Sequence, residues 1–428
     1  MKIEPATAVV GHIGVPGDKS ISHRAVLVGA VCEGETRIEG FGRSGETEST
    51  IAAVRALGVE VVEEDVDVLV VHGVGLRGLA APAGPIDCGV AGTLLAFLMG
   101  LLAGQDGEFV LSGEESLRLR SVEALADALR RMGAKVETTD GRPPVRIEGT
   151  QLSPVDHSLE RANAQVKSAL LLAGTQVREG RTVVTEPLFT RDHTETLLRA
   201  AGASISRSGR TVSVGPVERL HLGPVEVPGD ISSAAPFVTA ATLVAGSELS
   251  VHGVGVNPFR TALLDVLARM GSRIAVYDRR RLGGEAVADL EVRAAPLTAT
   301  TVRKAEVPRM IDELPLFALA AGLARGESGV RGAAQMREQG TDRIESVTNV
   351  LRSLGVRIEA SDDGFRVRGV PTRPKGGGPV PTRGDHRIAM LAAVGGLVSR
   401  EGVEIEDPDT VAVSFPGFFD LLESVTQR

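Results

Sequence analysis

One short motif near the start of the chain places cationic side chains where a helix is expected to begin. Residues 16–24 (Pro-Gly-Asp-Lys-Ser-Ile-Ser-His-Arg) form a turn that leads into a helix of small residues over 22–31. Lys19, Ser20 and Arg24 lie within about one and a half helical turns. The N–H groups and dipole of a helix N-terminus attract anions, and lysine and serine add donors. Each residue alone suits a capped helix with solvated charges, but the whole motif favours an anion-binding site.

Similar motifs recur along the chain. Residues 87–93 (Asp-Cys-Gly-Val-Ala-Gly-Thr) contain two glycines, which permit close approach of the backbone to a ligand. Residues 163–168 (Asn-Ala-Gln-Val-Lys-Ser) lead into an apolar helix, and residues 340–343 and 384–387 each place an arginine just inside a helix start. The cations that we group together are Lys19, Arg24, Arg120, Arg191, Arg343 and Arg387. They predict a pocket for a small substrate with several negative groups.

Two adjacent carboxylates, Asp312 and Glu313, lie among apolar residues in the segment 308–315 (Pro-Arg-Met-Ile-Asp-Glu-Leu-Pro). We expect at least one of them to be buried and either paired or catalytic, because burial shifts the pKa of a carboxyl group. The eight histidines include no HExxH or other close pair, so no metal is expected. The GxGxxG pattern within 72–78 is not followed by a helix pattern, and a GxxxxGK[ST] loop is absent, so no cofactor is expected.

The composition limits the partners of the chain. Its 428 residues contain 47 Lys and Arg against 55 Asp and Glu, a formal charge of −8, so general nucleic-acid binding is not expected. With no Trp and one Tyr, the chain has few rings for base stacking. The N-terminal residues do not resemble a signal peptide, and the longest apolar run, 91–103, is about half of a membrane span. We expect a cytoplasmic monomer that binds small anionic substrates and no membrane.

A recurring pattern indicates the elements that position these motifs. Helical stretches end at a glycine and a β-like run follows, because a C′ glycine adopts the left-handed conformation that lets the chain leave the helix. The stretches are 51–57, 122–132, 194–201, 261–270 and 344–354, and the glycines are Gly58, Gly133, Gly202, Gly271 and Gly355. Residues 415–425 predict a sixth such helix without a following strand. The pattern predicts an α/β chain of six similar units.

The tripeptide Pro-Gly-Asp indicates a duplication. It occurs at 16–18 and at 228–230, each time before a helix of small residues, 22–31 or 234–245. Pro-Gly-Asp is ordinary turn chemistry, but its recurrence with the same downstream pattern favours two similar lobes of three units each. The predicted domains are residues 1–18 with 230–428, and residues 19–229, with crossings near 16–20 and 228–232.

Taken together, the motifs resemble those of one known family. PGDKSISHR, AQVKSALLLAG, TRDHTE, DHRIAM and SFPGFF, in this order, resemble the 5-enolpyruvylshikimate-3-phosphate synthase (3-phosphoshikimate 1-carboxyvinyltransferase) family over essentially the whole chain. The resemblance implies an α/β fold of two lobes, each of three βαβαββ units around a pseudo-threefold axis, with the active site in the cleft between the lobes. It also implies transfer of the enolpyruvyl group from phosphoenolpyruvate to the 5-hydroxyl of shikimate-3-phosphate with release of phosphate, in the shikimate pathway.

The resemblance also implies roles for individual residues. Lys19 would contact both substrates and transfer protons, and Asp312 would be the base near the 5-hydroxyl. The residues implied for shikimate-3-phosphate are Lys19, Ser20, Arg24, Asn163, Ala164, Gln165, Arg191, Asp312 and Gln339. Those implied for phosphoenolpyruvate are Lys19, Gly92, Arg120, Gln165, Arg343 and Arg387.

The chain departs from the family pattern at several positions. Val90 and Ala96 stand where the family has Asn and Arg, and Gln339 and Gly340 stand where it has Lys and the Glu of the proton transfer. Two alternatives therefore stay open. One is a paralogue that binds shikimate-3-phosphate and eliminates its phosphate without phosphoenolpyruvate, as a lyase. The other is a non-catalytic binder of a phosphorylated metabolite, which the intact lysine, aspartate and arginine set disfavours.

Overall fold

The computed structural model describes residues 1–338 and 341–428, and the chain divides into two compact units. Unit 1 comprises Met1–Pro16, Pro228–Arg280 and Ala286–Arg428, and unit 2 comprises Gly17–Val227 and Arg281–Glu285. This division differs from the predicted lobes, 1–18 with 230–428 and 19–229, mainly at Arg281–Glu285. That hairpin turn groups with unit 2, and a Glu285 carboxylate oxygen lies 2.9 Å from Nδ1 of His193. The contact joins residues 92 positions apart, so no local pattern predicts it.

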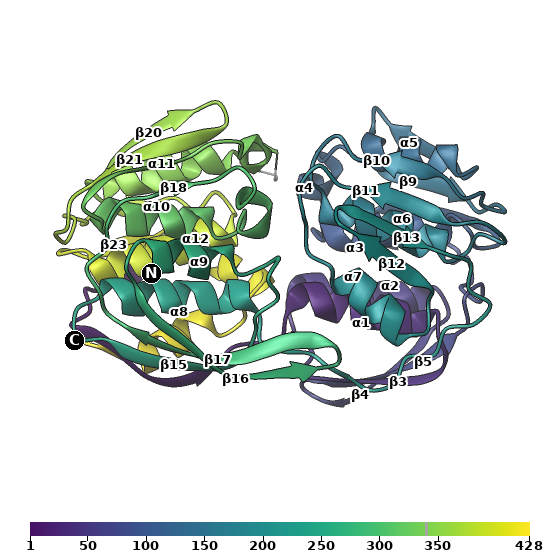
Figure 1. Cartoon of the computed structure of the whole chain (residues 1–428), viewed down its shortest axis with the longest axis horizontal. Helices are drawn as coiled ribbons and strands as arrows, with labels where there is room; N and C mark the ends of the chain where they lie inside the picture. The colour runs from purple at the N-terminus through teal and green to yellow at the C-terminus, as the bar shows by residue number, and fades with distance from the viewer. Residues whose placement is uncertain (339–340) are drawn as a thin grey trace. The chain divides into compact units, whose positions relative to one another are not determined.

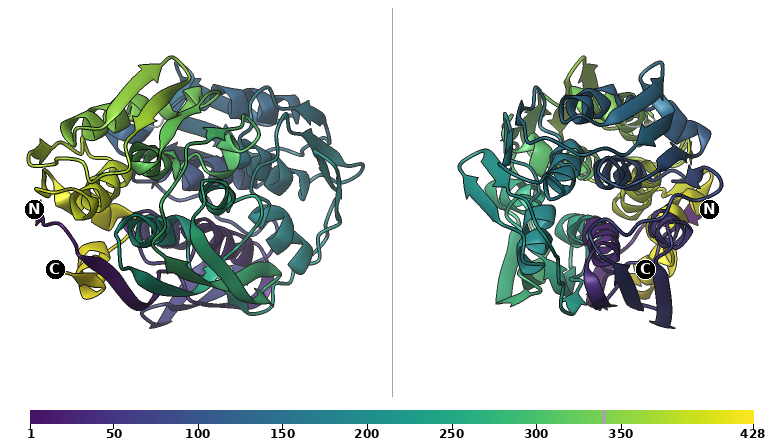
Figure 2. Two further views of the ribbon diagram at one scale, coloured as in Figure 1. Left: turned by 60° about the vertical axis from the view of Figure 1, so that its left-hand side comes forward. Right: turned by 90° about the vertical axis from the view of Figure 1, so that its right-hand side faces the viewer.

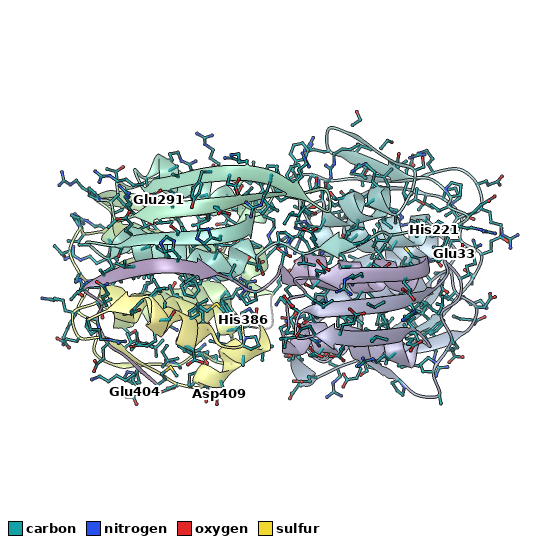
Figure 3. The ribbon with its side chains drawn as sticks, turned by 90° about the horizontal axis from the view of Figure 1, so that it is seen from below. Glu33, His221, Glu291, His386, Glu404 and Asp409 are labelled. Atoms are coloured by element: carbon teal, nitrogen blue, oxygen red, sulfur yellow. The ribbon has the colours of Figure 1, made fainter. Side chains whose placement is uncertain are left out.

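Unit 2 contains three four-stranded sheets within the described residues, each with one parallel and two antiparallel strand pairs. The first sheet has the strand order β14 (Val225–Glu226), β3 (Glu33–Glu39), β5 (Val68–Val74) and β4 (Glu60–Asp65). The second has the order β6 (Ile86–Asp87), β7 (Glu108–Ser112), β9 (Arg142–Glu148) and β8 (Lys135–Thr139). The third has the order β10 (Asp156–Ser158), β11 (Thr182–Thr185), β13 (Thr211–Val214) and β12 (Ile205–Ser208). Exposed and buried residues alternate along β9, so one of its faces points to solvent. Charged residues occupy exposed positions at the sheets; Glu33 of β3, for example, lies 3.7 Å from Nε2 of His221 (Figure 3).

Three helices of small and aliphatic residues form the core of unit 2: α1 (Lys19–Ala30), α3 (Gly92–Leu102) and α6 (Ala164–Gly174). The helices α2 (Gly45–Ala56), α5 (Glu123–Arg131) and α7 (His193–Ala200) each keep exposed positions, and α4 (Glu115–Arg118) is a single turn. Gly100 lets α3 and α6 pack closely. A Cβ atom at this position would lie only 2.2 Å from the carbonyl oxygen of Ala169.

Unit 1 repeats this plan. Its sheets contain β16 (Arg273–Leu282), β17 (Glu285–Arg293), β15 (Glu248–Gly255), β2 (Ala8–Gly14) and β24 (Thr426–Gln427); β18 (Thr301–Val302), β19 (Gly326–Val330), β21 (Gly364–Gly369) and β20 (Arg357–Ser361); and β1 (Lys2–Ile3), β23 (Val403–Ile405) and β22 (Pro379–Val380). Each sheet again has one parallel pair within the described residues. Figure 2 shows that both chain ends lie in this unit, where β1 and β24 join its sheets.

The buried helices of unit 1 are α8 (Ile231–Leu243), α10 (Leu314–Leu323) and α12 (His386–Val398), which pack against one another (Figure 1). The helices α9 (Ala262–Arg269), α11 (Arg343–Ser353) and α13 (Phe418–Ser424) each keep exposed positions. Short 3-10 turns occur at Val307–Arg309, Ala334–Arg337 and Pro408–Val413. None of the helices in the described ranges is long and apolar enough to span a membrane.

The predicted helix–glycine–strand pattern is confirmed. The predicted stretches correspond to α2, α5, α7, α9 and α11, and their following glycines have φ between 87° and 98°. The expectation that a sixth strand is missing is wrong, because β24 follows α13 and pairs antiparallel with β2. Two predicted starts are also late: α1 begins at Lys19 rather than 22, and α8 begins at Ile231 rather than 234. In both cases an aspartate side chain caps the helix directly after Pro-Gly.

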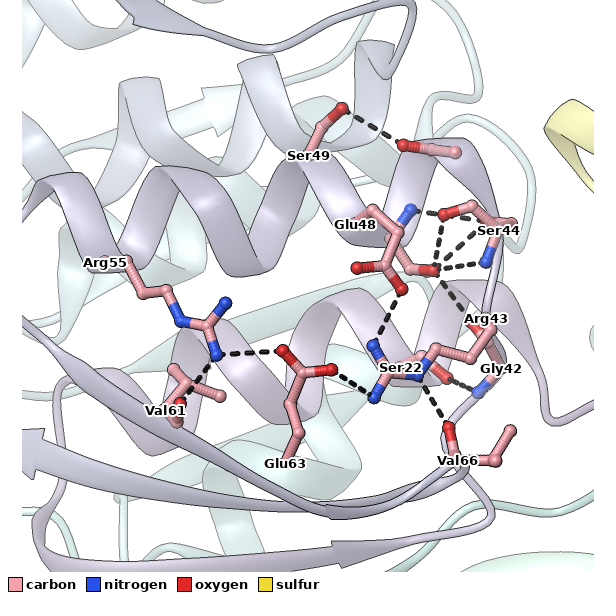
Figure 4. A network of polar contacts seen from close by, with 12 residues as sticks. Ser22, Gly42, Arg43, Ser44, Glu48, Ser49, Arg55, Val61, Glu63 and Val66 are labelled. Carbon is pink, nitrogen blue, oxygen red and sulfur yellow. Dashed lines mark hydrogen bonds and ion pairs between the residues drawn. The ribbon is translucent and has the colours of Figure 1, made fainter.

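The start of α2 is fixed by side chains that its sequence supplies. Ser44 and Thr47 form a reciprocal capping box, with the Ser44 N–H 2.9 Å from Oγ1 of Thr47 (Figure 4). Arg43, directly before the cap, donates to Glu63 of β4 at 2.7 Å. These contacts hold in place the first turn of α2, which carries Glu46.

Candidate active site

The predicted anion-binding residues of unit 2 gather at the N-termini of its buried helices. At α1, Asp18 accepts a hydrogen bond of 2.9 Å from the N–H of Ile21, and Lys19 follows as the first helical residue. The Lys19 ammonium forms an ion pair of 2.5 Å with Glu46, and the two side chains are 19% and 13% exposed. This ion pair is partly shielded from water and directs the ammonium toward one position. The first turn of α1 thus presents a fixed cation.

Arg24 is 2% exposed and joins three helices. Its Nε donates to Oγ1 of Thr194 at 2.7 Å, and its other two nitrogens donate to the carbonyl of Ser20 at 2.7 Å and to Oγ of Ser168 at 3.2 Å. The guanidinium also lies over the ring of Phe97, 4.5 Å from its centre. Arg24 therefore connects α1 to α6 and α7, and its orientation is set by several contacts at once.

His23, the neighbour of Arg24 in the motif, is completely buried. Burial lowers its pKa to about 4, with further lowering by the charges of Lys19 and Arg24 and an opposing effect from Glu46. Its Nδ1 lies 2.6 Å from Oγ1 of Thr50. The imidazole is therefore neutral at pH 7.

Arg191 lies next to the start of α1. Its NH1 donates to Oγ of Ser20 at 3.0 Å, which brings together two residues that are 171 positions apart. Asn163 caps α6 by accepting from the N–H groups of Gln165 at 3.0 Å and Val166 at 3.1 Å. Gln165 itself is exposed, and Ala164, the first residue of α6, is half-buried.

Gly92 and Arg120 lie against each other at the start of α3. A Cβ atom on Gly92 would lie 2.8 Å from NH1 of Arg120, so the guanidinium occupies the space that this glycine leaves. Val90 and Ala96, the two positions where the family has Asn and Arg, are half-buried near the same helix end. Arg120 therefore supplies a cation at this end of α3, where the chain lacks the family's arginine.

In unit 1 the structure brings together Asp312, Arg343 and Arg387. One carboxylate oxygen of Asp312 lies 3.3 Å from Nε of Arg387 and 3.7 Å from NH1 of Arg343. The side chains of Asp312 and Arg387 are each 15% exposed. A carboxylate can accept the proton of a substrate hydroxyl, and guanidinium groups can bind a substrate carboxylate.

Asp385 fixes the geometry of these arginines. It accepts from Nε of Arg343 at 2.6 Å and from the N–H of Arg387 at 2.9 Å, so it also caps α12. Burial raises the pKa of its carboxyl, but the charge of Arg343 outweighs that effect and the pKa falls to about 2. Asp385 is therefore ionised at neutral pH. Gln339 and Gly340, two of the predicted departures, lie outside the described residues.

Glu313 belongs to a second buried network beside Asp312. Its carboxylate accepts from the hydroxyl of Ser232, which also accepts from NH2 of Arg260 at 2.8 Å. Arg260 also pairs with Asp230 at 3.2 Å. Burial and the charge of Asp312 raise the pKa of Glu313. The prediction that one of the two adjacent carboxylates is buried and paired is therefore confirmed.

Sequence reasoning missed several partners of these residues. No motif indicated Glu46 or Arg260, because each pairs with a residue about 30 positions away in the sequence. Glu46 pairs with Lys19, and Arg260 pairs with Asp230. The only local signal was an acidic residue in the first turn of a capped helix, which is common. Within the described residues, no group of three or more His, Cys, Asp or Glu side chains could hold a metal.

Comparison with known proteins identifies the family. The model of the EPSP synthase (3-phosphoshikimate 1-carboxyvinyltransferase) family matches residues 3–422. The chain belongs to this family. A 3-phosphoshikimate 1-carboxyvinyltransferase of Alkalilimnicola ehrlichii is 46% identical over 421 residues, which are 98% of this chain and 94% of that protein. One of Gloeobacter violaceus is 45% identical over 429 residues, with 100% of this chain and 99% of that protein covered.

Solved structures agree with the EPSP synthase assignment. The EPSP synthase of Acinetobacter baumannii has a TM-score of 0.88 and 37% sequence identity, and the match covers 99% of this chain and 97% of that one. The enolpyruvyl transferase NikO of Streptomyces tendae shares the fold, with a TM-score of 0.79 at 20% identity over 99% and 96% of the two chains. The predicted α/β class and the βαβαββ repeat are confirmed; the order β10-α6-β11-α7-β12-β13 shows one repeat in full.

Proposed function

We propose that this EPSP synthase family member transfers the enolpyruvyl group of phosphoenolpyruvate to the 5-hydroxyl of shikimate-3-phosphate and releases phosphate. Relatives with 42–46% identity over nearly the whole chain are named for this activity. The observation that carries the proposal is the position of the Asp312 carboxylate, 3.3 Å from Arg387 and 3.7 Å from Arg343. It combines a base for a hydroxyl proton with two cations for a carboxylate.

The proposed chemistry needs one base and one acid. Asp312 accepts the proton of the 5-hydroxyl. The hydroxyl oxygen bonds at the same time to the carbon of phosphoenolpyruvate that bears the phosphate ester. Lys19 donates a proton to the methylene carbon, which becomes a methyl group in the tetrahedral intermediate. The Lys19 amine then takes a proton back from the methyl group as phosphate departs, and the double bond is restored. The ion pair of 2.5 Å with Glu46 supports this role, because it holds the Lys19 ammonium in one position.

The remaining residues are proposed to bind the anionic groups. Arg191, with its NH1 3.0 Å from Ser20, suits the 3-phosphate, and Arg24, which lies in the same network, suits the carboxylate of shikimate-3-phosphate. Arg120, packed against Gly92, suits the phosphate of phosphoenolpyruvate. Asn163, Ala164 and Gln165 complete the shikimate-3-phosphate set at the start of α6, and Arg343 and Arg387 take the phosphoenolpyruvate carboxylate.

The test is phosphate release from shikimate-3-phosphate with and without phosphoenolpyruvate, with products identified by proton NMR. Release that requires phosphoenolpyruvate and yields the enolpyruvyl ether is expected. Phosphate release from shikimate-3-phosphate alone, with a new ring alkene, would overturn the proposal in favour of the lyase. Binding of shikimate-3-phosphate without any turnover would favour the non-catalytic binder. The cytoplasmic location and the monomeric state stay predictions from the sequence.

A further inference from the structure

A buried lysine lies at the centre of a charged cluster in unit 2. Lys167 of α6 is 0% exposed, and its ammonium lies 2.9 Å from Oε1 of Glu195 and 3.2 Å from Oε2 of Glu186. Both carboxylates are also buried. The proposed chemistry does not use this lysine, although it lies two residues after Gln165 in the same motif.

The same ammonium also holds the backbone of the loop that carries Arg191. Lys167 Nζ donates to the carbonyl oxygen of Arg191 at 3.0 Å and to that of Thr190 at 3.4 Å. The Thr190 hydroxyl in turn donates to Glu186. The segment between β11 and α7 is thus bonded through its main chain and a side chain to one buried cluster.

The charges of the cluster balance. Arg207 lies 2.7 Å from Glu195 and 3.6 Å from Glu186, so two cations face two anions. Burial raises the pKa of Glu186. At Glu195 burial acts in the same direction, but the charge of Lys167 and the hydrogen bond from it outweigh it, so the pKa of Glu195 is lowered.

Burial of such a charged cluster costs free energy. Ions taken out of water lose hydration, and apolar residues of similar volume often give equal or greater stability. A buried ion cluster is therefore weak evidence for a purely stabilising role. What this cluster provides, and an apolar core would not, is an ammonium that donates to the carbonyl oxygens of Thr190 and Arg191, on either side of the Arg191 Cα atom.

We propose that Lys167 is a positioning residue for Arg191, and that it sets the affinity for the 3-phosphate of shikimate-3-phosphate. Its ammonium fixes the main chain at residues 190–191, and the Arg191 guanidinium is thereby held at Ser20, at the N-terminus of α1. Lys167 is 0% exposed, so it acts only through the loop. The inference rests on the proposed function, because it takes Arg191 as the ligand of the 3-phosphate.

The test uses a variant that keeps the cluster neutral, Lys167→Met with Glu195→Gln. Glu186 and Arg207 remain as a pair, so no buried charge is left without a counter-charge. We expect the dissociation constant for shikimate-3-phosphate, measured by calorimetry, to rise about tenfold or more, as for loss of hydrogen bonds from a charged group. Affinity for shikimate, which lacks the phosphate, should change little, and so should the KM for phosphoenolpyruvate.

A double-mutant cycle separates positioning from general loosening. In an Arg191→Ala background the same pair of substitutions should have no further effect on affinity for shikimate-3-phosphate, because the residue through which Lys167 acts is gone. An equal effect in both backgrounds, or an equal loss of shikimate and shikimate-3-phosphate affinity, would overturn the proposal. The matched control is Arg130→Met, which removes ion pairs of 2.5 Å and 2.6 Å at α5 in the same unit and should not change either affinity.

A variant that fails to fold does not end the test. Glu195→Gln alone keeps Lys167 and removes one of its anionic partners; we then expect a rise of about threefold in the dissociation constant for shikimate-3-phosphate, and an unchanged value would contradict the proposal. The wild-type protein tests the proposed function separately. If it binds shikimate-3-phosphate but forms no enolpyruvyl ether, the proposed function fails while the ratio of variant to wild-type affinity still decides the role of Lys167. If it binds no shikimate-3-phosphate, both fail.

Discussion

Replacement of Asp312 by Asn should affect turnover and phosphoenolpyruvate affinity in opposite directions. Asparagine keeps the size of the side chain but cannot accept the hydroxyl proton. Loss of a general base typically lowers a rate by about 10²–10⁴, so we expect kcat to fall by that factor. The side chain is only 15% exposed, so water cannot easily replace it as a base.

The affinity change follows from the ion pairs that Asp312 makes. Its carboxylate occupies Arg387 at 3.3 Å and Arg343 at 3.7 Å, the two cations proposed for the phosphoenolpyruvate carboxylate. Even exposed pairs contribute about 0.2–1 kcal/mol each, so these two more buried pairs together contribute at least about 0.4–2 kcal/mol. Release of both arginines should therefore lower the KM for phosphoenolpyruvate by about two- to thirtyfold.

Initial rates with each substrate varied in turn would test both effects. The matched control is Asp265→Asn, which removes a carboxylate 3.0 Å from Arg309 in the same unit and should leave kcat and both KM values unchanged. A kcat of Asp312→Asn within tenfold of the wild-type value would remove Asp312 from the proton transfer. A KM for phosphoenolpyruvate that rises instead of falling would refute the idea that Asp312 competes for the two arginines.

Three further predictions concern other residues. Burial lowers the pKa of His23 to about 4, so as the pH falls below about 6.5 the unfolded chain binds a proton at His23 before the folded chain does. The free energy of unfolding should therefore drop by up to about 3 kcal/mol between pH 6.5 and 4. Urea denaturation at several pH values should show that the free energy of unfolding of His23→Asn depends less steeply on pH than that of the wild type, and an equal dependence would contradict the prediction. Gly92→Ala should displace the Arg120 guanidinium, because its NH1 lies only 2.8 Å from the position of the new Cβ. The KM for phosphoenolpyruvate should rise about tenfold, and the KM for shikimate-3-phosphate should not change. An unchanged KM for phosphoenolpyruvate would contradict the proposed role of Arg120. Gly100→Ala should cost about 1–3 kcal/mol of unfolding free energy in a denaturant titration, because the Cβ would lie 2.2 Å from the backbone of Ala169, and full stability would show that α3 and α6 can separate freely.

Most of the fold could be predicted from local sequence patterns. The helix–glycine–strand repeats were predictable because a left-handed glycine is a short-range requirement, and Gly58 and Gly355 adopt φ of 87° and 88° as expected. The placement of Arg281–Glu285 with unit 2 was not predictable, since the contact between Glu285 and His193 depends on packing of distant segments. The strand β24 was missed because two residues are too short for a periodic signal.

The candidate site divides in the same way. The positions of Lys19, Arg343 and Arg387 at helix starts were predictable, because each is at or next to the first residue of a helix whose start a motif indicates. Their anionic partners were found less well, because an ion pair between remote segments leaves no spacing in the sequence. Lys167 belongs to one of the sequence motifs, yet its complete burial among carboxylates could not be inferred, since lysines are mostly exposed.

The buried helices differ in whether a side chain caps their first turn. Asp18, Asn163 and Asp230 cap α1, α6 and α8 with their side chains, and such a cap contributes about 1 kcal/mol. At α3 the capping position is Ala91, which has no side-chain acceptor, and at α10 the carboxylate of Glu313 accepts from Ser232 instead. These are the two helix starts beside the pair Gly92–Arg120 and beside Asp312. A side-chain cap at α3 would place an acceptor where a substrate phosphate is proposed to bind, so the absent cap is consistent with an end that an anion completes.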